Sequence, residues 1–215
     1  MPSTPAPRHR SVGTGPPDGH GLGPVLFVAA LAVEVAAFED VPVLVTGCGK
    51  LNAAVGLSRA LSAHRPDVVV NVGTAGALLD GYEGLQLVGE CIQHDLDALS
   101  LEQLTGERPT ERLDLGTGSG TVVATGDRVV TEAAEGRRIA GLGAHLVDME
   151  AFALARVCAA FDVPFLCAKY VSDRADDDVA ASWTASVHRA SEALFAWSRD
   201  LPADPPVPAS RPLTS

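Results

Sequence analysis

Apolar runs alternate along the chain with polar and glycine-containing segments, and their periods predict strands alternating with helices. The run Asp67–Val72 is dominated by β-branched valines, which is typical of a strand buried on both faces. Small and apolar residues at helical spacing predict the helices. Strands are predicted at Val25–Ala30, Val41–Thr46, Asp67–Val72, Gly84–Gln93, Thr121–Ala124 and Pro164–Val171, and helices at Asn52–Ala63, Thr131–Leu142, Met149–Phe161 and Ala180–Arg199. This order predicts a single-domain three-layer α/β/α fold with a central, largely parallel mixed sheet.

The two ends of the chain differ in composition from the rest. Residues 1–23 are rich in Pro, Gly and Ser and lack the apolar core of a signal peptide, so we expect a disordered leader. Residues 202–215 are Pro-rich and are expected to form a disordered tail, which leaves residues 24–201 as one domain. The apolar stretch Val25–Phe38 is interrupted by Glu34 and is too short to span a bilayer. We therefore expect a cytoplasmic protein with no membrane partner.

Composition narrows the possible partners and cofactors. The formal net charge is −11 and no Lys/Arg cluster offsets it, so a nucleic-acid partner is not expected. The four cysteines are far apart and contain no CxxC pair, which indicates buried thiols in a reducing compartment. The six histidines show no metal-ligand spacing, so neither a metal site nor another cofactor is expected.

Three carboxylates stand in apolar surroundings. Glu150 opens a predicted helix whose later residues on the same face are apolar, and a carboxylate on a core face costs free energy unless something holds it. Asp173, preceded by Ser172, follows a predicted buried strand, where an α/β sheet exposes chemistry to a ligand. Glu34 follows the first strand, although capping or exposure to solvent is an alternative interpretation. Carboxylates delivered to one cavity indicate acid–base chemistry on a small molecule.

Two glycine-rich segments and one histidine have ordinary structural interpretations. Gly47-Cys48-Gly49-Lys50 lacks the third glycine of a dinucleotide fingerprint and the Ser or Thr of a Walker loop, so we interpret it as a tight strand-to-helix turn beside a ligand. The segment 116–120 precedes a strand and is interpreted as a flexible hairpin turn. His94, next to Asp95, is interpreted as a structural or pocket-edge residue.

Six segments, in order along residues 25–197, resemble the nucleoside phosphorylase and nucleosidase superfamily. The segment 30–35 is similar to the N-terminal stretch of methylthioadenosine/S-adenosylhomocysteine nucleosidases. The others resemble the superfamily's GxGK turn (47–50), its glycine-rich strand end (71–78), its SGD segment (124–127), its ribose-binding MEA segment (148–151) and its purine-binding SDxAD segment (171–176). One such match is weak, but six in sequence imply the phosphorylase/hydrolase-like fold and hydrolysis of a purine N-glycosidic bond.

The resemblance also implies roles for individual residues. Asp173 matches the acid that protonates the purine at N7, and Glu34 matches the glutamate that polarises the attacking water. The remaining matches are to substrate-binding positions: Glu150 for the ribose hydroxyls, Met149 for packing on the sugar, Ser172 for orienting the acid, Thr74 and Lys169 near the water, Gly76 for close approach of the backbone to the sugar, and Val129 where many members have a base-stacking Phe.

Hydrolysis and phosphorolysis are distinguished by the nucleophile pocket. Phosphorolysis requires cationic groups for phosphate, and the segment 29–36 contains Glu34 but no Arg or Lys. We therefore predict a purine nucleosidase acting on a purine nucleoside or its 5′-thio derivative, with a nucleoside phosphorylase, a futalosine-type hydrolase and a non-catalytic nucleoside-binding protein as alternatives. Relatives form homodimers, which implies a homodimer here. Between Glu34 and Val41 the chain is shorter than the nucleosidases, so part of the pocket wall or dimer surface is missing or rebuilt.

Overall fold

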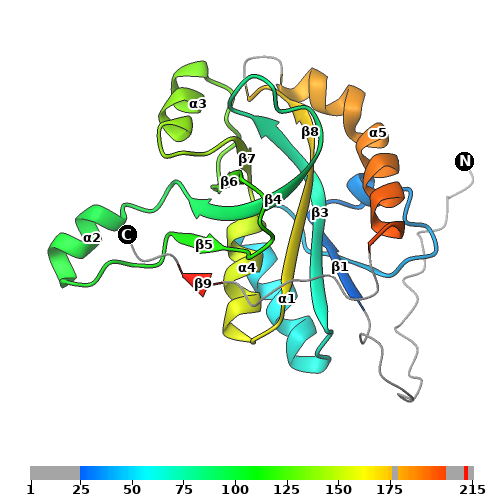
Figure 1. The fold of residues 1–215 in the computed structure, drawn as a ribbon, viewed down its shortest axis with the longest axis horizontal. Coiled ribbons are helices and arrows are strands. Elements are labelled where there is room, and N and C mark those ends of the chain that lie inside the picture. Colours follow the sequence, from blue (N-terminus) through cyan, green and yellow to red (C-terminus); the bar gives the residue numbers. More distant parts are fainter. Residues whose placement is uncertain (1–24, 176–178, 202–210, 213–215) are drawn as a thin grey trace, which may run out of the picture.

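The computed structural model describes residues 25–175, 179–201 and 211–212 of the 215-residue chain. The strands are β1 (Val25–Ala29), β2 (Val43–Val45), β3 (Val68–Ala77), β4 (Gly84–Gln93), β5 (Arg112–Asp114), β6 (Thr121–Thr125), β7 (Leu146–Asp148), β8 (Phe165–Asp173) and β9 (Arg211–Pro212). The helices are the 3₁₀ turn η1 (Ala32–Val35) and α1 (Lys50–Ala63), α2 (Ala98–Thr105), α3 (Ala133–Ala140), α4 (Ala151–Ala160) and α5 (Val179–Arg199). The predicted α/β fold with a mixed central sheet is confirmed (Figure 1).

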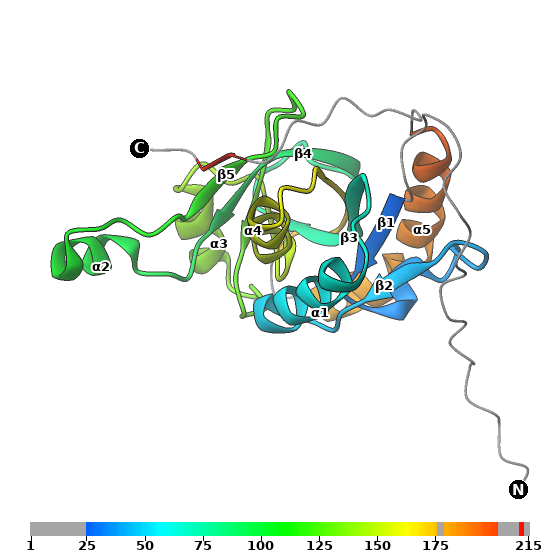
Figure 2. The same cartoon turned by 90° about the horizontal axis from the view of Figure 1, so that it is seen from below.

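The sheet is more strongly curved than an open α/β sheet. Strands β2, β1, β3 and β8 pair in parallel, and β4, β6 and β7 form a second parallel group. Antiparallel pairings of β3 with β7 and of β4 with β8 join the two groups. Among the described residues, β3, β8, β4, β6 and β7 therefore close a ring, which is visible from below in Figure 2.

Strand β3 lies at the junction of the two groups and packs two separate cores. Val69, Ala75 and Ala77 belong to the core beneath α1 and α4. Val68, Val70 and Val72 belong to the core beneath η1 and α5. Because successive side chains of a strand point to opposite faces, a strand buried on both faces is apolar throughout rather than alternating. This pattern predicted the strand Asp67–Val72, whereas β3 continues to Ala77.

Strand β4 can turn from one neighbour to the next because of a bulge at Gly89. The residues Gly84–Leu87 pair with β8, whereas Val88–Gln93 pair with β6, with a register shift between Val88 and Glu90. A Cβ on Gly89 would lie 1.8 Å from the carbonyl oxygen of Ser119. Only glycine therefore allows the two backbones to approach this closely.

Several local predictions need correction. Helix α4 begins at Ala151 instead of Met149, because Asp148 ends β7 and its Oδ2 accepts the backbone N–H of Ala151 at 2.9 Å. The elements η1, α2 and β5 were not predicted. The segment 116–120 is not a hairpin turn, since β5 and β6 both pair with β4 and not with each other.

The termini are described only in part. The predicted leader, residues 1–23, and most of the predicted tail lie outside the described residues. Within the tail, β9 pairs antiparallel with β5, which differs from the expected disorder at those two positions. Helix α2 stands away from the sheet at the end of an arm in both views (Figures 1 and 2). In the described part of the chain, no helix combines the length and apolar character needed to cross a bilayer.

Gly89→Ala is expected to lower the free energy of unfolding by roughly 3 kcal/mol, because the new methyl group overlaps a backbone oxygen that cannot rotate away. Gly120→Ala is the matched control, since a Cβ there meets no atom within 4 Å and the residue has no positive φ. Urea denaturation of both variants measures the difference. Equal stability of the two variants would show that the bulge does not require glycine.

Candidate active site

A cavity of about 350 Å³ lies where the strands end at their carboxyl side. Its walls come from η1 after β1, the turn after β2, the second half of β3 and the segments that follow β6, β7 and β8. This is the edge at which α/β sheets bind ligands. Of the residues predicted from the sequence, it is lined by Glu34, Thr74, Gly76, Val129, Met149, Glu150, Ser172 and Asp173.

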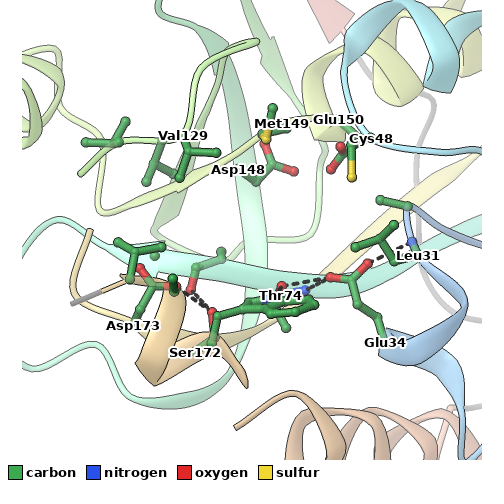
Figure 3. Close-up of a pocket in the computed structure, with 18 of the residues that line it drawn as sticks. Leu31, Glu34, Cys48, Thr74, Val129, Asp148, Met149, Glu150, Ser172 and Asp173 are labelled. Atoms are coloured by element: carbon green, nitrogen blue, oxygen red, sulfur yellow. Dashed lines mark hydrogen bonds between the residues drawn. The ribbon is translucent and has the colours of Figure 1, made fainter. Parts of the chain in front are cut away.

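The three predicted carboxylates come together although they are remote in sequence. Figure 3 shows Met149 and Glu150 on one side of the cavity. Glu34 and Asp173 lie on the facing side, toward its two ends, with Thr74 between them. A ligand in the cavity therefore meets one acid at each end of one wall and a third acid on the other wall.

The Glu34 carboxylate accepts hydrogen bonds at a gap in the strand pairing of β3. One edge of β3 pairs with β8, and the other pairs first with β1, up to Asn71, and then with β7, from Gly76. In the gap between β1 and β7, the backbone N–H of Thr74 donates to Glu34 Oε1 at 2.8 Å. The Thr74 hydroxyl donates to the same oxygen at 2.7 Å, and Leu31 N donates to Oε2 at 3.0 Å. These donors explain how Glu34 is only 5% exposed without an ion-pair partner among the described residues.

Asp173 is oriented by a bulge between β3 and β8. The register shifts so that Ala75 faces Val171 and Gly76 faces Asp173, and such bulges re-aim side chains at the ends of strands. Asp173 Oδ2 accepts the Ser172 hydroxyl at 2.7 Å, and Oδ1 accepts the backbone N–H of Ala175 at 2.9 Å. A Cβ at position 76 would lie 2.7 Å from Oδ1, so glycine is needed beside this carboxylate. Asp176, the last residue of the predicted purine-binding segment, lies outside the described residues.

The surroundings of Glu150 shift the pKa of its carboxyl. Burial raises its pKa to about 7, and the nearby charge of Asp148 adds to the effect. Lys169 and the backbone N–H of Gly49 act in the opposite direction, the latter through a 2.7 Å hydrogen bond to Oε1. Gly49 has a φ of +93°, a conformation that favours glycine. The predicted tight turn between β2 and α1 is thus present and directs a backbone donor at Glu150.

Lys169 lies behind the cavity wall. Its Nζ is 2.8 Å from Asp148 Oδ2, and both side chains are almost fully buried. Burial lowers the pKa of the Lys169 ammonium, but the Asp148 carboxylate raises it to well above its usual value. A Cβ on Gly73 would be 3.3 Å from Glu34 Oε1 and 3.6 Å from Lys169 Nζ, so the ammonium and Glu34 flank the same glycine. Lys169, predicted from the sequence to lie near the water, is therefore close to Glu34 but does not line the cavity.

Several cavity residues were not predicted as site residues, among them Leu31, Cys48, Arg128, Asp148 and Trp183. Leu31, Cys48 and Asp148 lie within recognised segments and Arg128 directly follows one, so their positions in the sequence could have pointed to them. Trp183 had no such signal, because it lies within α5, ten residues after Asp173. Its Nε1 donates to Thr74 Oγ1 at 3.0 Å.

No group of three His, Cys, Asp or Glu side chains within the described residues could hold a metal ion. His94 does not reach this cavity and lines a neighbouring one of about 320 Å³, which shares Arg128, Val129 and Val130 with it. The predicted role of His94 as a structural or pocket-edge residue is consistent with this position. The cavity therefore offers carboxylates, hydroxyls and apolar walls, which suit proton transfer on an uncharged organic ligand.

Similarity to known proteins agrees with this chemistry. Residues 92–198 match the family model described as "Phosphorylase superfamily". A 5′-methylthioadenosine/S-adenosylhomocysteine nucleosidase from Geobacillus kaustophilus is 31% identical over 179 residues, which cover 70% of this chain and 76% of that enzyme. An enzyme of the same name from Exiguobacterium is 29% identical and aligns with 74% of this chain and 81% of its own length.

Solved structures share the fold. The S-adenosylhomocysteine nucleosidase from Streptococcus pyogenes, in complex with 5-methylthiotubericidin, superposes with a TM-score of 0.74 at 18% identity, covering 86% of this chain and all of that one. The futalosine hydrolase of Helicobacter pylori gives a TM-score of 0.71 at 20% identity, covering 82% of this chain and 97% of that one. With a relative at 31% identity over three quarters of its length, and with the cavity assembled from the matching segments, the chain belongs to the methylthioadenosine/S-adenosylhomocysteine nucleosidase family of the phosphorylase superfamily.

Proposed function

We propose that this protein is a purine nucleosidase that hydrolyses the N-glycosidic bond of methylthioadenosine, S-adenosylhomocysteine or a related purine nucleoside. The observation that carries the proposal is the convergence of Glu34, Glu150 and Asp173 on one cavity of about 350 Å³. That volume falls within the range of pockets that enclose small ligands. The curated relatives bear the name of this activity.

The proposed mechanism divides proton transfer between the ends of the cavity. Asp173, oriented by Ser172, donates a proton to N7 of the purine, so that the base leaves as a neutral molecule. Glu34 accepts a proton from the attacking water, which adds to the anomeric carbon as positive charge develops on the sugar. The products are the free base and the ribose derivative. Thr74 lies beside Glu34 and would border the position of the water.

The opposite wall would bind the sugar. Glu150 accepts hydrogen bonds from the ribose hydroxyls and Met149 packs against the ring, while Gly76 allows close approach of the β3 backbone. Val129 and Val130 offer an apolar surface to the base, and Val129 is 58% exposed. Asp148 also lines this wall, and Lys169 supports it from behind.

Hydrolysis is favoured over phosphorolysis by the charges around Glu34. Among the described residues that line the cavity, Arg128 is the only cation, and it belongs to the segment of Val129 at the base end. Lys169 is already paired with Asp148. A phosphate beside Glu34 would meet a carboxylate and no free cation, whereas a water molecule would meet a hydrogen-bond acceptor.

We also propose that the protein is a cytoplasmic homodimer. Exposed apolar side chains gather on α1, at Leu51 and Val55, and on the projecting α2, at Leu99 and Leu104. Exposed leucines of this kind mark surfaces that bind another protein. Three cysteines are buried free thiols, which fits a reducing compartment.

The reaction is tested by incubating the protein with methylthioadenosine, S-adenosylhomocysteine, adenosine, inosine and futalosine in phosphate-free buffer and measuring free base and reducing sugar. We expect release of adenine and a ribose derivative from the first two substrates, with no stimulation by added phosphate. A strict requirement for phosphate would identify a phosphorylase. Preferential hydrolysis of futalosine would identify a futalosine-type hydrolase, and tight binding without turnover would indicate a binding protein.

Asp173→Asn is expected to lower kcat by roughly 10²–10⁴-fold, the usual contribution of a general acid. The amide oxygen can still accept one of the two hydrogen bonds made by the carboxylate, so the fold should persist. Asp67→Asn, at an exposed position just before β3, is the control and should retain full activity. Retention of activity within a few-fold by Asp173→Asn would exclude this residue as the acid.

The raised pKa of Glu150 predicts a pH dependence of stability. The folded protein keeps this proton up to a pH of about 7, whereas a carboxyl with the ordinary value of 4.5 has already lost it. The unfolded state therefore binds fewer protons between these values, and stability falls as pH rises through this window. The group contributes up to about 3 kcal/mol of this fall.

In Glu150→Gln this contribution is absent, and the variant should lose less stability than the wild type between pH 4.5 and 8. Urea denaturation at successive pH values measures the difference. Glu192→Gln, on the exposed side of α5, is the control. Parallel curves for Glu150→Gln and the wild type would contradict the prediction.

A further inference from the structure

Trp183 is joined to the predicted water-activating group by a continuous chain of hydrogen bonds. Its indole Nε1–H donates to Thr74 Oγ1 at 3.0 Å, and that hydroxyl donates to Glu34 Oε1 at 2.7 Å. The three groups come from α5, β3 and η1, and they line the same cavity. No segment recognised in the sequence includes Trp183.

The chemistry of the three groups decides which of them donates and which accepts in this series of hydrogen bonds. An indole N–H is only a donor, and an ionised carboxylate is only an acceptor. The Thr74 oxygen must therefore accept from Trp183, which leaves its own proton for Glu34. Without the indole, the hydroxyl can rotate and its lone pairs can take a proton from another donor. The partly buried setting strengthens such a chain.

Helix α5 is also tied to the other end of the cavity. Three residues after Trp183, the hydroxyl of Ser186 lies 3.1 Å from the carbonyl oxygen of Ser172 and 2.8 Å from that of Ser182 in its own helix, so the two carbonyls share its single proton. Residues three apart lie on one face of a helix. One face of α5 therefore contacts Thr74, which binds Glu34, and Ser172, which binds Asp173.

We propose that Trp183 is a positioning residue for Glu34, acting through the Thr74 hydroxyl. The inference rests on the proposed function, in which Glu34 activates water. Trp183 keeps the Thr74 proton directed at Oε1, and this leaves Oε2, which also accepts Leu31 N, to interact with the water. The indole ring therefore influences the chemical step through its N–H as well as forming part of the wall.

The first test compares Trp183→Phe with Trp197→Phe. The chain has two tryptophans, and Trp197 also lies on α5 but packs on the core beneath the helix. We expect Trp183→Phe to lower kcat roughly fivefold to tenfold with little change in KM, the size expected for removing one hydrogen bond. Trp197→Phe should remain within about twofold of the wild type. An unchanged kcat in Trp183→Phe, or a change in KM alone, would overturn the proposal.

A double-mutant cycle tests whether the effect passes through Thr74. In a Thr74→Val background the hydroxyl is absent, so adding Trp183→Phe should have no further effect on kcat. Additive effects would show that Trp183 acts by packing alone, and would overturn the proposal. The fall in kcat of Glu34→Gln gives the full loss of activity when water activation is removed.

Two further measurements separate folding and function from this inference. Benzothienylalanine at position 183 keeps the shape of the indole and lacks the N–H, so it replaces Trp183→Phe if that variant does not fold, with the same expected fall in kcat. In Trp197→Phe the remaining tryptophan is Trp183, and its fluorescence should change when a non-hydrolysable purine nucleoside analogue binds. Binding without hydrolysis by the wild type would refute the proposed function, whereas hydrolysis with no effect of the N–H would refute the role of Trp183.

Discussion

The site depends on a gap in the pairing of one strand. The same edge of β3 is shared by β1 and β7, and between them the backbone of β3 has no neighbouring strand on that side. An unpaired N–H at this depth must find another acceptor, and the Glu34 carboxylate takes that position against Thr74. The hydrogen bond that replaces a missing strand neighbour therefore also holds the acid that would activate water. The position of this acid thus depends on the order in which the strands pair.

The second constraint is electrostatic, because three carboxylates, those of Glu34, Asp148 and Glu150, lie near one buried cation. Lys169 pairs with Asp148, which is also held by the Thr125 hydroxyl at 2.6 Å and by a backbone N–H. A buried ion pair is tolerated when its remaining hydrogen-bonding capacity is filled in this way. Burial raises the pKa of Glu150 and the Asp148 charge adds to this, and the charge of Lys169, which is paired with Asp148, offsets only part of the rise. Among the described residues, the same ion pair leaves no free cation at the Glu34 end of the cavity, which is the physical basis for preferring water to phosphate as nucleophile.

Much of the fold was predictable because its strands have strong local patterns. Strand β3 is apolar on both faces since it packs two cores, and β4 was found with its bounds unchanged. The start of α4 was misplaced because Asp148-Met149-Glu150 has helical character in sequence, whereas the Asp148 side chain caps the helix from the end of β7. The ring of strands had no local signature, because the bulge at Gly89 has meaning only through its contact with Ser119, thirty residues later in the chain.

Most of the strands and helices, the family and the residue types of the site could be derived from the amino-acid sequence, because they follow from local periodicity and from short segments that resemble known ones. The tertiary structure alone decided which side chains share one cavity, that Lys169 lies behind its wall, and that Trp183 reaches Thr74 from α5. The physical reason is that side-chain hydrogen bonds and burial depend on pairing between residues as far apart as 109 positions. Such pairing is set by how the sheet closes and not by any local pattern.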